Sequence, residues 1–137
     1  MSDFLSREEF LKTAQPKVEK VWIESLQNYV YLKEISGDDQ DSYDLAMVEF
    51  VDQPDGGSKA RAKLDNARSK YIVRALSDHN GQRLFRDNEY HLIGAKSTAV
   101  LKELHDAAKR VNGVTEEDEK EMEKNLEVEQ TGGSNSD

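Results

Sequence analysis

Apolar and polar positions alternate along residues 18–23, and a second run rich in β-branched and aromatic side chains spans residues 29–35. Both patterns are typical of β-strands, so together they predict a β-hairpin over residues 18–35. A two-stranded ribbon alone is only marginally stable in water. We therefore expect the hairpin to cover one side of a helical core.

Downstream of the hairpin, apolar residues recur at steps of three and four, the spacing of an amphipathic helix. This spacing predicts a helix over residues 38–50 and a central helix over residues 59–76. The segment between them, residues 52–58, concentrates turn formers and should be an exposed loop. A compact turn at residues 77–85 should follow the central helix.

The last part of the core is predicted to be helical as well. Asp87 can cap a helical turn that ends at Gly94, and a clean apolar stripe predicts a further helix over residues 97–111. We expect Leu101 and Leu104 to lie in the core. Phe85 should pack on that helix from the preceding turn.

Both ends of the chain carry capping boxes. The one at Ser6 predicts a short helix that Pro16 stops, and the one at Thr115 predicts an acidic helix that runs to about Leu126. Residues 127–137 have the composition of a disordered tail.

These elements define an α+β fold that is mainly α, with an N-terminal β-hairpin packed on a small helical domain, an acidic C-terminal helix and a disordered tail. A chain of 137 residues is long enough for one core and short for two. The expected organisation is one domain over residues 1–126, made of an N-terminal arm (1–17), the hairpin (18–35), the helical core (36–113) and the acidic helix (114–126).

Charge and composition restrict the function. The net charge is −9, of which residues 115–137 carry −7, and such a tail repels nucleic acid and anionic membrane surfaces. The chain has no cysteine and no apolar run long enough to span a bilayer. We therefore expect a cytoplasmic protein that binds neither nucleic acid nor membrane.

The sequence contains only weak matches to catalytic or metal-binding motifs. Residues 78–89 place oxygen side chains as a calcium loop does, but Arg83 stands where glycine is needed, so a turn held by local hydrogen bonds is the better interpretation. His79, His91 and His105 are too scattered to share a metal and are expected on the surface. The sequence also lacks a nucleophile elbow and a phosphate loop. It predicts no enzyme activity, no metal and no cofactor.

The central helix has a basic outer side in an acidic chain, at Lys59, Arg61, Lys63, Arg68, Lys70 and Arg74. This contrast fits either a docking face or a solvated surface paired with nearby acids. For partner binding, the candidate residues are Tyr71, Ile72, Leu76, Arg61, Arg68 and Arg74.

Four segments carry a further signal through their order and spacing: the strand and cap Tyr29–Gly37, the turn Gly81–Phe85 followed by Asp87 and Glu89, the segment Ile93–Ser97, and the segment Arg110–Asp118. Together they resemble the tail assembly chaperones of long-tailed phages, over about residues 18–125.

The resemblance implies a protein of phage or prophage origin that acts in the host cytoplasm and is not an enzyme. Members of that family bind the long, helical, aggregation-prone tape measure protein, bring it together with tail tube protein, and are absent from the finished tail. Many also occur as a longer product of ribosomal frameshifting. A homo-oligomer is compatible with this function.

Two other classes stay open at the sequence level. A generic acidic helical adaptor or regulator would have the same composition. A metal-dependent hydrolase would need clustered carboxylates, and metal titration tests that alternative.

Overall fold

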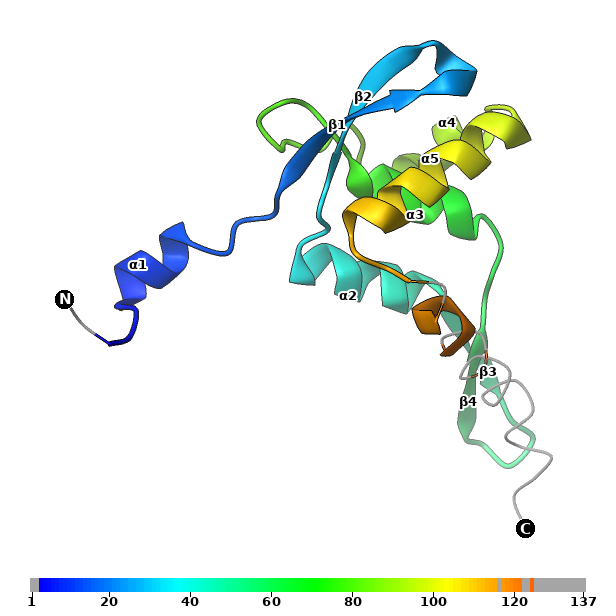
Figure 1. The fold of residues 1–137 in the computed structure, drawn as a ribbon. Helices are drawn as coiled ribbons and strands as arrows, with labels where there is room; N and C mark the ends of the chain where they lie inside the picture. The colour runs from blue at the N-terminus through cyan, green and yellow to red at the C-terminus, as the bar shows by residue number, and fades with distance from the viewer. Residues whose placement is uncertain (1–2, 116, 122–123, 125–137) are drawn as a thin grey trace.

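The computed structural model describes residues 3–115, 117–121 and 124. Helix makes up 47% and strand 21% of the structure, in two small sheets, which confirms the mixed, mainly helical class (Figure 1). The elements in chain order are α1 (Arg7–Lys12), β1 (Val18–Ile23), η1 (Glu24–Leu26), β2 (Asn28–Lys33), α2 (Gly37–Ala46), β3 (Val48–Asp52), β4 (Ser58–Ala62), α3 (Ala67–Ala75), β5 (Leu76–Ser77), η2 (Asp87–Glu89), α4 (Tyr90–Gly94) and α5 (Thr98–Val111).

The predicted hairpin is confirmed. Strands β1 and β2 pair antiparallel with Val21 opposite Val30, and the short strand β5 adds to the other edge of β2. The turn is a single 3₁₀ turn that Gln27 ends in the left-handed conformation (φ 51°). Alternation puts Val21, Ile23 and Leu32 on the buried face, as the sequence pattern requires.

Helix α5 holds the hairpin at both of its ends. The carboxylate of Glu103 accepts hydrogen bonds from the backbone N–H groups of Glu24 (2.6 Å) and Ser25 (2.8 Å) in the turn. At the other end, the Asn112 side chain accepts a hydrogen bond from the Ile35 backbone N–H (2.7 Å). The hairpin therefore covers the helical core, as predicted.

The helices predicted over 38–50 and 59–76 are each shorter than expected, and the residues between them form a second hairpin. Helix α2 ends at Ala46, and β3 pairs with β4 so that Phe50 lies opposite Ala60. Helix α3 begins only at Ala67, after Asn66 in the left-handed conformation (φ 57°). The predicted exposed loop is the turn of this hairpin.

This correction has a physical reason in the sequence itself. The segment after α2 is rich in β-branched and aromatic residues, which favour a strand followed by a turn. Ala60, Ala62 and Leu64 are spaced by two, the period of a strand, while Ala60 and Leu64 alone also satisfy the helical step of four. The helical interpretation used the second spacing and missed the first.

Both predicted capping boxes are present. Ser6 and Glu9 cap α1, and Figure 1 shows this helix projecting from the body of the molecule, with none of its residues buried. At the other end, the Asp118 backbone N–H donates to the Thr115 hydroxyl (3.1 Å), and residues 117–121 are helical. Apart from Lys124, the rest of the predicted acidic helix and the predicted disordered tail lie outside the described residues.

The core lies between the first hairpin and helices α3 and α5. Ile72, Val73 and Ala108 are inaccessible to solvent, and Leu104 is buried with them as predicted. Phe85 and Leu101 are only half-buried at the edge of this core, a weaker burial than expected. Within the described part of the chain, no helix has the length and apolar character needed to cross a membrane.

Candidate functional site

The structure buries most of the predicted partner-binding face, and in the described part of the chain only Tyr71 and Arg68 of that prediction line a groove. Tyr71 and Leu76 are each 6% exposed and Ile72 is fully buried. Arg74 is also buried, at 3%. These residues lie at the centre of the domain because α3 is enclosed by α2, α4 and α5, which sequence periodicity cannot show.

The two remaining arginines of that prediction are exposed but not adjacent in one helix. Arg61 lies on β4 and pairs with Glu49 across the second hairpin. Arg68 lies in the first turn of α3, on the rim of a groove between α2, α3 and α5. The predicted continuous basic face therefore does not exist, since the residues before Ala67 are not helical.

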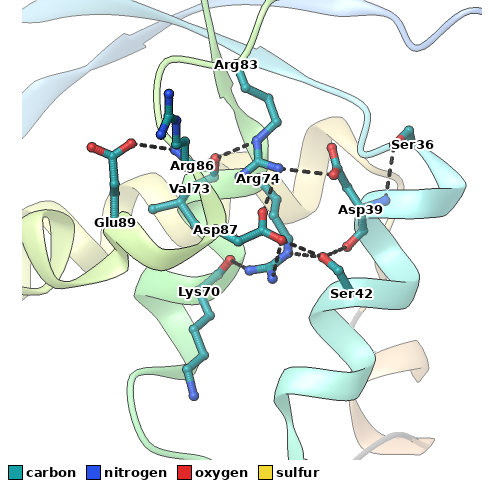
Figure 2. Close-up of polar contacts among 10 residues, drawn as sticks. All are labelled: Ser36, Asp39, Ser42, Lys70, Val73, Arg74, Arg83, Arg86, Asp87 and Glu89. Carbon is teal, nitrogen blue, oxygen red and sulfur yellow. Dashed lines mark hydrogen bonds and ion pairs between the residues drawn. The ribbon is translucent and has the colours of Figure 1, made fainter.

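Arg74 belongs to a polar cluster between α2, α3 and η2 (Figure 2). Its guanidinium donates to the Ser42 hydroxyl (2.9 Å) and to the Lys70 carbonyl (2.6 Å), and it lies 3.3 Å from an Asp87 carboxylate oxygen. Arg83 lies 2.7 Å from the other Asp87 oxygen and 3.0 Å from Asp39. The cluster joins three elements that are distant in sequence.

The two arginines of this cluster are paired with two aspartates, Asp39 and Asp87. Burial alone would raise the pKa of the Asp87 carboxyl, but the hydrogen bond from Arg83, the charge of Arg74 and the Ser42 hydroxyl together lower it. Burial lowers the pKa of the Arg74 guanidinium, and the Asp87 charge opposes that shift. Because each of these charges has a partner of opposite sign, the cluster links α2, α3 and η2, and we call it the Arg74 clamp.

The calcium-like segment is a turn with local hydrogen bonds, as the sequence indicated. The Asp78 carboxylate accepts from the backbone N–H groups of Asn80 (2.8 Å) and Gln82 (3.0 Å), and these bonds lower its pKa, the one from Gln82 most. Glu89 accepts from the Arg86 N–H (2.7 Å). No group of three or more potential ligands among the described residues is placed to hold a metal ion.

The groove between α2, α3 and α5 has a mostly apolar lining. It has a volume of about 450 Å³, in the range of ligand sites. Its floor and walls are largely apolar or aromatic, formed by Tyr43, Met47, Leu64, Ala67, Tyr71 and His105.

The groove's rim is charged. Three cations, Arg68, Lys102 and Lys109, and two acids, Asp106 and Glu119, line it. Lys109 pairs with Glu119 and lies 3.8 Å from Asp106. Among the described residues, Arg68 and Lys102 have no ion-pair partner.

Two groups in the groove are held neutral at physiological pH. Burial, with the charges of Lys109 and Arg68, lowers the pKa of His105 to about 4. Burial, with Tyr43 and Glu119 nearby, raises the pKa of Tyr71 to about 12. The two rings stack edge to face with centroids 5.3 Å apart. His105 is thus half-buried, which corrects the expected surface position, whereas His79 and His91 are exposed as predicted.

Sequence reasoning missed the groove because its lining comes from four separate segments. Helical spacing places Leu64 on the face of a helix, yet it lies in the link between β4 and α3 and is 50% exposed. Met47 is the C-cap of α2, and its side chain is 8% exposed, part of the core and of the groove lining. An available signal was the strand spacing at Ala60, Ala62 and Leu64, which would have put Leu64 outside the helix.

Comparisons of the chain with protein-family models, with curated proteins and with solved structures found no match.

Proposed function

We propose that this chain is a phage tail assembly chaperone that binds an apolar helical segment of a tape measure protein in the groove between α2, α3 and α5. The observation that carries the proposal is this groove, whose floor is apolar and whose rim is charged. An amphipathic helix inserts apolar side chains into such a groove and keeps its polar face in water. The resemblance over residues 18–125 supplies the identity of the partner.

The composition of the groove suits a partner with many similar helices. Methionine is flexible and adapts to side chains of different shape, and Met47 lies in the wall. Leu64 is half-exposed at the edge, where a bound helix would cover it. A chaperone for a long, repetitive protein benefits from such tolerance, because it meets many related segments.

The proposal extends to the wider role of the family. The chain would act in the host cytoplasm without catalysis, metal or cofactor, and would bring the tape measure protein to tail tube protein, in part through a longer frameshifted product. A gene order that places this chain between a tail tube gene and a very long, coiled-coil-rich gene would support it.

Coexpression with the tape measure protein of the same genome tests the groove directly. The partner should be soluble only with the intact chain, and Leu64→Glu should abolish that effect because it puts a charge at the apolar edge. Leu92→Glu is the matched control, since Leu92 is equally exposed on α4 but lies outside the groove. A partner that is soluble alone, or insoluble with the intact chain, would favour the adaptor function instead.

A further inference from the structure

We propose that the helix bound in the groove is acidic along its flanks, and that the acidic segment 117–121 of this chain competes with it for the rim. This inference rests on the proposed function and names the chemistry of the partner at that same site. The proposal rests on the charges of the groove's rim, some of which have ion-pair partners among the described residues while others have none there.

The first argument is charge complementarity. Arg68 of α3 and Lys102 of α5 are exposed at the groove, and neither pairs with an acid among the described residues. A helix bound in the groove therefore meets an unpaired cation from each of these two helices. Glutamate or aspartate on those flanks meets a cation, whereas lysine meets like charge.

The second argument is the contact that already exists at one end of the groove. Glu119 pairs with Lys109 of α5 and lines the rim beside Val114. Its charge is close enough to the floor to raise the pKa of Tyr71 and to oppose the lowering of the His105 pKa. The protein itself therefore places an acidic side chain at this rim.

These two observations imply that residues 117–121 and the bound helix compete for the same cations on the rim. Without Glu119, the rim holds three cations against the single carboxylate of Asp106. A partner helix with acidic flanks meets Lys109 where Glu119 already pairs with it, so the two acids compete for one cation. The segment carries four acids and one lysine over residues 117–121, so it resembles the flank of the partner in charge but brings no apolar residue to the floor.

Two synthetic peptides test the partner chemistry with the full-length chain. Each has about 16 residues, enough for a helix, with leucines on one face and either glutamates or lysines on both flanks. The glutamate peptide should bind more tightly than the lysine peptide by fluorescence anisotropy. The double variant Arg68→Glu, Lys102→Glu should weaken the glutamate peptide by about tenfold, since rim charges contribute modestly. Lys96→Glu, outside the groove, should have no effect.

Competition is tested with Glu119→Gln, which should strengthen binding of the glutamate peptide about threefold, in keeping with one surface pair. Glu117→Gln is the matched control in the same segment and should leave binding unchanged. Peptide binding should also speed amide hydrogen exchange in residues 117–121. Unchanged exchange on binding, or weaker binding by Glu119→Gln, would overturn the competition.

The outcomes separate the two proposals. Equal binding of both peptides, lost in Leu64→Glu, would overturn the acidic partner and leave the groove's function standing. If neither peptide binds any variant, both proposals fail. If the glutamate peptide binds only after deletion of residues 1–13, the N-terminal arm occupies the groove, and the competition by residues 117–121 is wrong.

Discussion

Arg74 is 3% exposed, so its guanidinium depends on protein groups for the hydrogen bonds that water would otherwise supply. Those groups come from α2, from α3 and from Asp87 at the start of η2. A basic residue on a predicted docking face is therefore part of the clamp that holds the helices together. For a single charged side chain, its burial and its hydrogen-bond partners decide whether it is available to another protein or stabilises the fold.

Replacing Arg74 with alanine should lower the free energy of unfolding by about 3 kcal/mol, at the low end for a broken buried pair because Asp87 remains half-exposed. Arg68→Ala, on the exposed side of the same helix, should change it by less than about 0.5 kcal/mol. Urea denaturation of both variants measures the difference. Equal, small effects would show that the Arg74 clamp contributes little to stability.

His105 makes stability depend on pH. Its pKa falls from 6.5 to about 4 on folding, so between these values the unfolded chain binds the proton more readily. The contribution of His105 is therefore complete above pH 6.5 and is lost as the pH falls toward 4. Urea midpoints should drop more steeply from pH 7.5 to 5 for the wild type than for His105→Gln. Parallel pH profiles would argue against burial of this ring.

At the scale of elements, the turn after β5 approaches the first hairpin closely. Gly81 has a φ of +82°, and a Cβ there would lie 3.1 Å from a methyl carbon of Val18. The positive φ favours glycine, and the close approach leaves little room for a Cβ. The turn thus packs against Val18 at the start of β1.

Gly81→Ala should destabilise the protein by about 1 to 2 kcal/mol, the cost of a left-handed residue with a side chain. Gly37→Ala is the matched control, because Gly37 starts α2 and a Cβ there would meet nothing within 4 Å. It should be neutral or stabilise by about 0.5 kcal/mol through the unfolded state. Thermal unfolding of the two variants checks the ranking, and a reversed order would contradict the turn geometry.

For the molecule as a whole, the N-terminal arm (residues 1–17) and the rest of the domain differ in how much they contribute to the hydrophobic core. Phe4, Leu5, Phe10 and Leu11 of the arm are all more than half exposed, and α1 buries no residue. The arm and α1 therefore add little to the core.

Deleting residues 1–13 should leave the free energy of unfolding within about 0.5 kcal/mol of wild type, as for surface changes in general. The deletion keeps Lys17, whose backbone bonds to Glu34 close the start of the hairpin. Denaturant unfolding measures the effect, with deletion of residues 1–23 as the positive control because it removes β1. A large loss from the shorter deletion would mean that the arm packs on the body.

The sequence alone determined the elements for which hydrophobic periodicity, residue propensity and capping residues all indicate the same structure. The first hairpin followed from alternation over residues 18–23 and from the β-branched and aromatic residues of 29–35. Helix α5 followed from one apolar stripe with a serine cap at its start. Both have short-range causes, namely the period of the backbone and hydrogen bonds within one turn. The helical caps at Ser6 and Thr115 were equally readable.

Only the tertiary structure decided what lies inside. Two periods fit the residues around Ala60, and pairing of β3 with β4 selected the strand. An apolar stripe predicts burial but does not identify the neighbour. The sequence pattern alone therefore places Tyr71 and Arg74 on a binding face, whereas both are buried in the folded chain. The groove brings together four segments that are remote in sequence, and its shape depends on side chains that meet only when the helices pack.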